Sequence, residues 1–218
     1  MQTCFSCALV GAAAFDARHF LQERFDAVVA VDGGYEALVR SGVRPDFAIG
    51  DFDSLGYVPR DVAIERHPSM KDDSDTALAL DWARRRGFDS VAFYGVLGGR
   101  LDHTHAALAA LAHAARSGMR AAAIGEGSVV TVLSSRGYSA LDLPAYDQGT
   151  FSVFAYGAFA PLVTERGSKY EIDGVAMRDD STLGLSNEFA GSAVRIAVRE
   201  GDAAVYLPAC PLSDLRFS

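Results

Sequence analysis

The chain has 218 residues, half of them hydrophobic, and a formal net charge of −8 at pH 7. This length allows one large domain or two modest ones, with enough apolar residues for a real core. The acidic balance argues against nucleic-acid binding, which needs a basic surface. No apolar run approaches the ~20 residues that cross a bilayer, and no basic segment opens a signal peptide, so we expect a cytoplasmic protein without membrane contacts.

The first 133 residues alternate between apolar runs and helical patterns. Apolar strands separated by helices are typical of a mostly parallel sheet with helices on both faces, so we predict an α/β domain over 1–133. The expected strands are Cys4–Val10, Ala27–Val31, Phe47–Ile49, Val62–Glu65, Val91–Tyr94, Ala121–Ile124 and Val129–Leu133. The expected helices are Gly34–Arg40, Asp75–Arg86 and His103–Ser117.

After Leu133 the long helical patterns vanish, and Gly, Pro and Tyr become more frequent. Short alternating segments predict a smaller β-sandwich domain over 134–218. Its expected strands are Tyr138–Leu143, Thr150–Tyr156, Pro161–Glu165, Val194–Val198 and Ala203–Leu207. The polar segment 173–187 is predicted to be a loop.

Two carboxylates follow one of the short apolar runs. Phe47–Ile49 ends at Gly50, and Asp51 and Asp53 come next. A strand that ends in a turn would place both carboxylates at the edge of the sheet. Oxygen ligands at this spacing suit Mg²⁺, which binds carboxylates together with substrate phosphates. Gly, Asp and Ser are also ordinary turn residues, so this segment alone leaves both interpretations open.

Two other segments carry similar residues beside expected strands and helices. Asp32-Gly33-Gly34 follows Ala27–Val31, and Gly98-Gly99-Arg100-Leu101-Asp102 precedes the third helix. In an open α/β sheet ligands bind beyond the carboxyl ends of the strands, and glycines ahead of a helix let backbone N–H groups approach a phosphate. Arg100 would add a bidentate phosphate donor, whereas Asp102 could be only the N-cap of the helix.

Three carboxylates and a lysine lie within five positions at Lys71-Asp72-Asp73-Ser74-Asp75. Asp and Ser cap helices, and acidic residues favour the positive end of a helix dipole. Capping needs only one or two such residues, so we favour a functional interpretation. Asp75 could complete a metal site with Asp51 and Asp53, and Lys71 could meet a phosphate.

Cys4 and Cys7 form a C-x-x-C pair inside the first expected strand. A reactive thiolate forms more readily at the start of a helix than within a strand. We therefore expect buried, inert thiols, and a redox protein with reactive surface thiols is the minor alternative.

Together these segments resemble the successive signatures of thiamine pyrophosphokinases. The first domain contributes Asp32-Gly33-Gly34, Pro45–Ser54 with its Gly-Asp-x-Asp-Ser, Lys71-Asp72-x-x-Asp75 and Gly95-x-x-Gly98-Gly99-Arg100-x-Asp102-His103. In the second domain, Gly167-Ser168-Lys169-Tyr170 resembles a Gly-x-x-Tyr segment of that family, and Gly184–Phe189 resembles its Ser-Asn-Glu-Phe motif. The order, the spacing and the change to a β domain also match over nearly the whole chain.

The resemblance implies a reaction and an assembly. The enzyme would transfer the pyrophosphoryl group of MgATP to the hydroxyethyl oxygen of thiamine, giving AMP and thiamine diphosphate. It would be a homodimer whose sites combine the α/β domain of one subunit with the β domain of its partner, which would bind thiamine and mediate dimerisation.

The resemblance also implies roles for individual residues. Asp51, Asp53 and Asp75 would hold Mg²⁺ and the phosphates, and Lys71 would act beside them in catalysis. Thiamine would be contacted by Ser186 and Asn187. The nucleotide would be bound by Asp32, Gly33, Gly34, Gly98, Gly99, Arg100 and Asp102.

Two other functions compete with this one. A pyrophosphokinase for a hydroxymethyl pterin would share the α/β domain and many of these carboxylates, although the Ser186–Phe189 motif and the β-sandwich favour thiamine. A non-catalytic nucleotide or thiamine sensor would be expected to lose its metal carboxylates, and this chain retains them.

Overall fold

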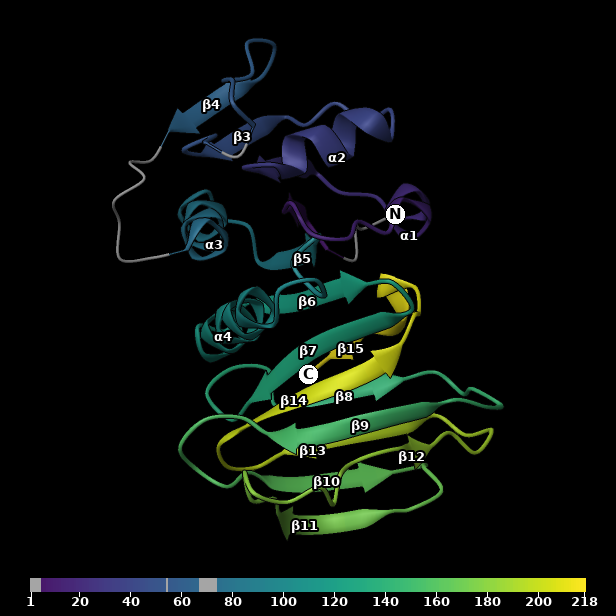
Figure 1. Cartoon of the computed structure of the whole chain (residues 1–218). Helices are drawn as coiled ribbons and strands as arrows, with labels where there is room; N and C mark the ends of the chain where they lie inside the picture. Colours follow the sequence, from purple (N-terminus) through teal and green to yellow (C-terminus); the bar gives the residue numbers. More distant parts are fainter. Residues whose placement is uncertain (1–4, 54, 67–73) are drawn as a thin grey trace. The chain divides into compact units, whose positions relative to one another are not determined.

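The computed structural model describes residues 5–53, 55–66 and 74–218 (Figure 1). The chain divides into two compact units, Met1–Ala110 with Ala123–Glu126, and Leu111–Ala122 with Gly127–Ser218. Helix α4 (Leu101–Arg116) and strand β6 (Arg120–Gly125) contribute residues to both units. The division by function predicted above, 1–133 and 134–218, stays a prediction, because these units are defined by packing alone.

The first unit contains a parallel sheet with the strand order β5-β1-β2-β3-β4. Its strands are β1 (Cys7–Val10), β2 (Ala27–Val31), β3 (Phe47–Gly50), β4 (Ala63–Arg66) and β5 (Ser90–Tyr94). The chain moves outward from β1 to β4 and then returns through α3 (Asp75–Arg85) to β5, on the other side of β1. The mostly parallel sheet predicted from the alternating pattern is therefore confirmed.

Helices cover both faces of this sheet. The strand register places Phe47 and Tyr94 on opposite faces. Trp82 of α3 packs against Phe47 with 5.0 Å between ring centroids, and Phe20 of α1 (Ala17–Gln22) packs against Tyr94 at 5.1 Å. These aromatic contacts bury large apolar surfaces on each side, which is why the strands are apolar throughout rather than alternating.

The second unit is β-sandwich-like, with two antiparallel sheets (Figure 1). One sheet has the order β12-β9-β14-β7, made of β12 (Asn187–Glu188), β9 (Thr150–Ala155), β14 (Asp202–Pro208) and β7 (Ser128–Ser134). The other has the order β11-β10-β13-β8-β15, made of β11 (Ile172–Ala176), β10 (Leu162–Arg166), β13 (Val194–Val198), β8 (Ala140–Leu143) and β15 (Arg216–Phe217). A 3-10 turn, Leu212–Asp214, precedes β15.

Several elements differ from the sequence-based expectation, among them the short strands β12 and β15, which were not predicted. Helix α1 was not predicted, because its six residues are too few to show a helical period, although Asp16 caps it by accepting a hydrogen bond from the His19 N–H. The prediction of a loop over 173–187 was wrong for its first part, where β11 pairs with β10. Because β11 is an edge strand and largely solvent-accessible, it lacks the apolar alternation that would mark it.

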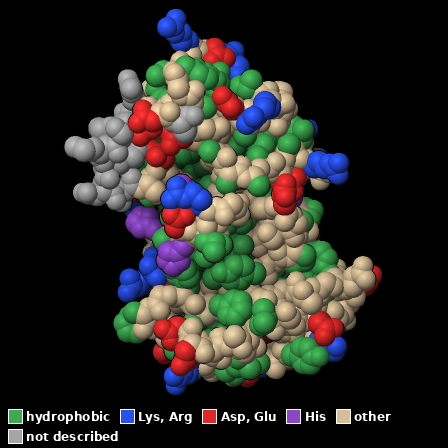
Figure 2. Space-filling model, in the orientation of Figure 1, with side chains coloured by type: hydrophobic (Ala, Val, Ile, Leu, Met, Phe, Trp, Pro, Cys, Tyr) green, Lys and Arg blue, Asp and Glu red, His purple; other side chains and the backbone are tan. Residues whose placement is uncertain are grey.

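In the described part of the chain, no helix is long and apolar enough to cross a membrane. On the face drawn in Figure 2, basic side chains are spread among acidic and hydrophobic ones rather than gathered in one patch.

Helix α2 (Gly34–Arg40) begins with its backbone against the end of β1. A Cβ on Gly34 would lie 1.7 Å from the carbonyl oxygen of Val10. We therefore expect Gly34→Ala to lower the free energy of unfolding by about 2 kcal/mol, because overpacking forces the backbone apart. Helix propensity alone predicts the opposite, since Ala is up to about 1 kcal/mol better than Gly in a helix. Denaturant unfolding of both proteins decides between them, and a more stable variant would contradict the close approach.

Candidate active site

A pocket of about 430 Å³ lies in the first unit, at the carboxyl ends of the parallel strands. Strand order reverses between β1 and β5, and such a reversal is where open α/β sheets bind ligands. The volume of the pocket is in the range of small-molecule sites. The lining residues are Gly11, Ala12, Ala13, Val31, Asp32, Ser74, Asp75, Thr76, Gly95, Val96, His103 and Ala106.

Glycines bring the ends of β1 and β5 together at this pocket. A Cβ on Gly11 would lie 2.6 Å from the Gly95 carbonyl oxygen, and a Cβ on Gly95 would lie 2.4 Å from the Gly11 carbonyl oxygen. The Gly11 N–H donates to the Tyr94 carbonyl at 2.8 Å, and the Ala13 N–H donates to the Gly95 carbonyl at 2.8 Å. The wall of the pocket is therefore main chain, which a ligand can approach closely.

Asp32 lies at the centre of a group of carboxylates. The Asp75 side chain is within hydrogen-bonding reach of Asp32, and the Asp51 charge acts on it as well. Burial, followed by the hydrogen bond and charge of Asp75, raises the pKa of Asp32 to about 7, although the Phe52 N–H at 3.4 Å opposes the shift. The structure thus joins Asp32 to two of the predicted metal ligands, whereas the sequence indicated it only as a nucleotide contact.

The turn after β3 holds Asp51 in place. The Asp51 carboxylate accepts a hydrogen bond from the Asp53 N–H at 3.1 Å. Phe52 has a φ of 62° and is only 2% exposed, so its buried ring anchors the turn between two solvent-accessible acids. Gly50 is required here because a Cβ would lie 1.8 Å from the Asp32 carboxylate oxygen. The Asp53 carboxylate itself is exposed.

The start of α3 leaves Asp75 available for the pocket. Ser74 is the N-cap, and its hydroxyl accepts a hydrogen bond from the Ala77 N–H at 3.3 Å. Asp75 is therefore not needed as a cap, and it lines the pocket beside Asp32. Lys71, predicted to meet a phosphate, lies outside the described residues, as do Asp72 and Asp73.

The donor set of this cluster fits a divalent cation that also binds phosphate. Within residues 5–53, 55–66 and 74–218, no three acidic, His or Cys side chains are placed so that they could hold a metal ion by themselves. Asp32, Asp51 and Asp75 nevertheless bring negative charge close enough for one carboxyl to retain its proton near neutral pH. A cation would relieve that repulsion, and Mg²⁺ normally completes its coordination with phosphate oxygens and water.

The glycine segment before α4 lies beside the pocket rather than in its lining. Gly98 and Gly99 have φ values of 80° and 66°, and a Cβ on either would meet open space. Arg100 and Asp102 form an exposed ion pair at 2.5 Å, and Arg100 lowers the pKa of Asp102 to about 2. Helix α4 begins at Leu101, so Asp102 is in its first turn and is not the N-cap. The nucleotide contacts of these four residues stay a prediction.

The two residues predicted to contact thiamine differ in exposure. Ser186 is exposed and has a left-handed backbone with a φ of 56°, and its N–H donates to the Ser152 hydroxyl at 3.0 Å. Asn187 is 7% exposed, and its amide is occupied by hydrogen bonds within the second unit. Their contacts with thiamine stay a prediction.

The sequence analysis missed the parts of the pocket that depend on backbone approach. Gly11 follows an expected strand, and that position is the one signal by which it could have been found; Gly95 was marked as part of a motif, but its close approach to Gly11 was not predicted. His103 lines the pocket, although the sequence marked it only as part of a motif. Gly33 is the N-cap of α2, and because it is a glycine it makes no side-chain hydrogen bond to the helix.

The thiol of Cys7 is buried and unreactive. Its side chain is fully buried, and burial raises its pKa to about 12. Cys4 lies outside the described residues. Because a thiol nucleophile must ionise and be reached, Cys7 cannot serve the redox alternative.

The raised pKa of Asp32 predicts a pH-dependent stability. A carboxyl whose folded-state pKa exceeds its unfolded value costs stability as pH rises from about 4 towards 7, and the cost is complete above that range. Asp32→Asn removes the charge, tolerates the left-handed φ of 47°, and keeps an acceptor for the Phe52 N–H. Without divalent cations, its melting temperature should exceed that of the unaltered protein by an amount that grows between pH 4 and 7. A difference independent of pH would show that Asp32 ionises normally.

Known proteins resemble this chain in sequence and fold. Residues 19–123 match the family model of the thiamin pyrophosphokinase catalytic domain. A thiamine pyrophosphokinase from Bacillus subtilis (strain 168) is 27% identical over 177 residues, which cover 75% of this chain and 78% of that protein. The crystal structure of thiamin pyrophosphokinase from Geobacillus thermodenitrificans has a TM-score of 0.78 at 24% identity, covering 94% of this chain and 97% of that one.

The fold extends to more distant enzymes. The crystal structure of yeast thiamin pyrophosphokinase has a TM-score of 0.75 at 14% identity, covering 96% of this chain and 87% of that one. The segment matched by the family model contains the whole carboxylate cluster around Asp32. The sequence match over residues 19–123, the relative from Bacillus subtilis and the shared fold agree, and each of them makes this chain similar to thiamine pyrophosphokinases.

Proposed function

We propose that this protein is a thiamine diphosphokinase, which moves the pyrophosphoryl group of ATP to the hydroxyethyl oxygen of thiamine in the cytoplasm. The observation that carries the proposal is the carboxylate group of Asp32, Asp51 and Asp75 beside a pocket at the strand reversal. In a chain similar to thiamine pyrophosphokinases, that arrangement provides the charge needed to bind a metal–triphosphate.

The residues of the first unit would bind and orient ATP. Asp51, Asp53 and Asp75 would hold Mg²⁺, which neutralises phosphate charge when it is bound. Backbone N–H groups at the start of α3 and in the Gly98-Gly99 turn are suited to phosphate oxygens. Asp32, Gly33 and Gly34 would contact the nucleotide from the end of β2.

Lys71, Arg100 and Asp102 would complete the transfer site. A cationic side chain stabilises the charge that spreads over phosphoryl oxygens in the transition state, and Lys71 and Arg100 supply two such groups. Asp102 holds the Arg100 guanidinium through two hydrogen bonds, at 3.1 and 2.5 Å. Binding of the triphosphate would compete with this exposed ion pair.

The transfer has a definite balance of bonds. The hydroxyl oxygen of thiamine attacks the β-phosphorus of ATP, and the bond from that phosphorus to the oxygen shared with the α-phosphate breaks. AMP leaves with that oxygen, and the hydroxyl proton is released. Ser186 and Asn187 would hold the acceptor, whose thiazolium cation suits an acidic surrounding.

We also propose a homodimer in which the α/β domain of one subunit and the β domain, 134–218, of its partner form each site. Such an interface is symmetric, so every dimer contains two sites. The acceptor residues and the nucleotide residues would then act across the two subunits.

The reaction products test the proposed activity. Incubation with MgATP and thiamine should give AMP and thiamine diphosphate in equal amounts, and excess chelator should stop the reaction. Chromatography separates these products from ADP and thiamine monophosphate, which would indicate an ordinary kinase. Turnover with a hydroxymethyl pterin but not with thiamine would indicate the pterin enzyme instead.

The carboxylates are tested by isosteric substitution. Asp51→Asn or Asp75→Asn should lower kcat by roughly 100-fold or more, because each removes a charge that positions the metal–triphosphate. Glu36→Gln is the matched control, since Glu36 is in the same unit and forms an exposed ion pair with Arg40 at 3.7 Å. Near-normal turnover of either Asn variant would remove that residue from the mechanism.

The shared site predicts complementation between inactive subunits. A dimer of Asp51→Asn and Ser186→Ala subunits would contain one site with neither substitution. Mixing the two proteins under conditions that exchange subunits should therefore restore up to about a quarter of the wild-type activity per total subunit. Full activity of a monomer in light scattering, or no recovery after verified exchange, would contradict the shared site.

A further inference from the structure

A buried polar cluster in the second unit lies directly behind the Ser186 turn. It consists of Glu165 at the end of β10, Ser168 in the following loop and Asn187 of β12, which are 2%, 7% and 7% exposed. Ser168 and Asn187 come from the two segments that resemble the Gly-x-x-Tyr and Ser-Asn-Glu-Phe motifs, and Glu165 lies two residues before the first of them. The mechanism above gives no task to Glu165 or Ser168.

The Asn187 amide has one possible orientation in this cluster. Its oxygen accepts hydrogen bonds from the N–H groups of Tyr170 at 3.1 Å and Glu188 at 2.8 Å. Its nitrogen donates to the Tyr170 carbonyl at 2.9 Å. These backbone hydrogen bonds distinguish the amide oxygen from the amide nitrogen, so the nitrogen must face Glu165 and Ser168.

Glu165 supplies a buried acceptor for that nitrogen. One carboxylate oxygen accepts from the Asn187 amide, and the Ser168 hydroxyl accepts from the same nitrogen at 3.1 Å. The other Glu165 oxygen is buried and has no hydrogen-bond partner among the described residues. Burial raises the pKa of Glu165 above its ordinary value. Burying an ionisable side chain costs free energy of folding, and packing alone does not explain why this position has a glutamate.

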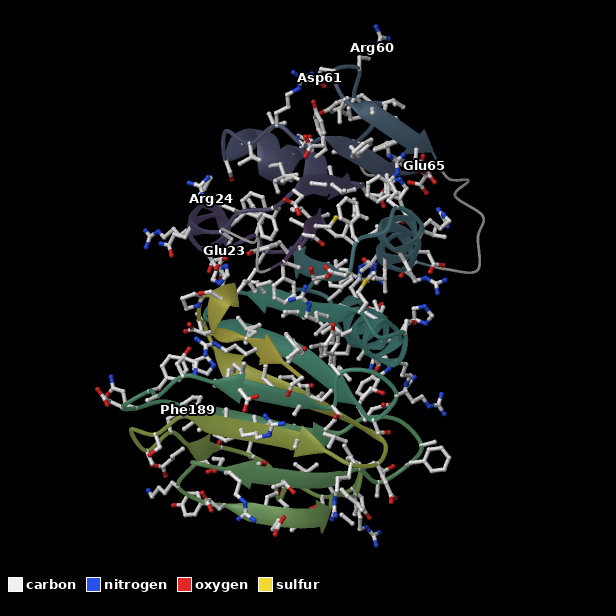
Figure 3. All side chains as sticks on the ribbon, turned by 180° about the vertical axis from the view of Figure 1, so that it is seen from behind. Glu23, Arg24, Arg60, Asp61, Glu65 and Phe189 are labelled. Atoms are coloured by element: carbon white, nitrogen blue, oxygen red, sulfur yellow. The ribbon has the colours of Figure 1, made fainter. Side chains whose placement is uncertain are left out.

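The cluster fixes the turn that precedes it. Ser186 has a left-handed backbone, which is unfavourable for a residue other than glycine. The turn is held on one side by the Ser152 hydroxyl and on the other by Asn187, beyond which Phe189 (Figure 3) packs against Phe151 at 5.0 Å. Exposed apolar side chains surround it, and they are Tyr170, Leu183 and Leu185.

We infer that Glu165 is a positioning residue, which holds Asn187 and through it the Ser186 turn in the shape that receives the acceptor alcohol. This inference rests on the proposed function and adds to it a residue that does not touch substrate. Asn187 then acts by holding the backbone of the Ser186 turn, in addition to the thiamine contact that its motif predicts. Loss of the buried acceptor would release the Asn187 amide and let the turn relax, so binding of the acceptor would weaken while binding of ATP would not.

Steady-state kinetics of two Glu165 variants test the inference. Glu165→Met keeps the length of the side chain but removes the acceptor, and it should raise the KM for thiamine roughly 10-fold or more. The KM for MgATP should stay within about twofold, because the ATP pocket is in the first unit. Glu165→Gln keeps an acceptor oxygen and should restore a thiamine KM near that of the wild type.

A matched variant separates positioning from general loss of stability. Val163→Ala alters the same face of β10, two residues away, at a fully buried side chain outside the cluster. It should lower the melting temperature without changing the thiamine KM by more than about twofold. An equal rise in thiamine KM for Val163→Ala and Glu165→Met, or no rise for Glu165→Met, would overturn the inference.

The remaining outcomes are also decisive. If Glu165→Met does not fold, Glu165→Ala, which also removes the acceptor, takes its place, and a thiamine KM equal to the wild type would overturn the inference. If the wild-type protein releases no AMP with thiamine, the proposed function fails and this inference falls with it. A normal wild type with an unaffected Glu165→Met overturns the inference alone.

Discussion

The first unit is organised by backbone segments that approach more closely than side chains allow. At Gly11, Gly34 and Gly95 an added Cβ would lie between 1.7 and 2.6 Å from a carbonyl oxygen of a neighbouring segment. This contact draws the ends of β1 and β5 and the start of α2 together at the strand reversal. Under the proposed function, phosphate binding would therefore depend on converging strand ends and carboxylates, whereas a P-loop protein uses one glycine-rich loop.

The proposed nucleotide site and the proposed acceptor site use buried polar groups in opposite ways. Around Asp32 the carboxylates are close enough to repel one another, and this repulsion adds to burial, the main cause, in raising the pKa of Asp32. That repulsion makes the site favourable for a cation that arrives with its phosphate. Around Asn187 the donors and acceptors are almost fully paired, so the cluster is stiff and holds backbone in place. The carboxylates around Asp32 favour a cation, and the cluster around Asn187 holds the backbone in place.

Local patterns in the sequence predicted the elements well, and the missing parts depend on tertiary contacts. The apolar runs identified every strand of the parallel sheet, because strands buried on both faces must be apolar. Helix α1 and strand β11 were too short or too exposed to carry a periodic signal. Asp32 lies in a segment that the sequence singled out, but its pairing with Asp75 requires β2 and α3 to meet, which no local pattern encodes. The same is true of Glu165, whose partner is more than twenty residues away.

Backbone strain marks both halves of the molecule. Among the described residues other than glycine, positive φ values occur at Asp32, Phe52 and Ser186, and all three lie in segments singled out for chemistry. Each conformation is maintained by its surroundings: the Asp32 N–H donates to the Ile49 carbonyl, the Phe52 ring is buried, and the Ser152 hydroxyl holds the Ser186 N–H. Strained residues persist only where neighbouring contacts determine them, and such places are commonly functional. The strain at Ser186 therefore argues that its turn is maintained for recognition, because an unconstrained surface turn would relax.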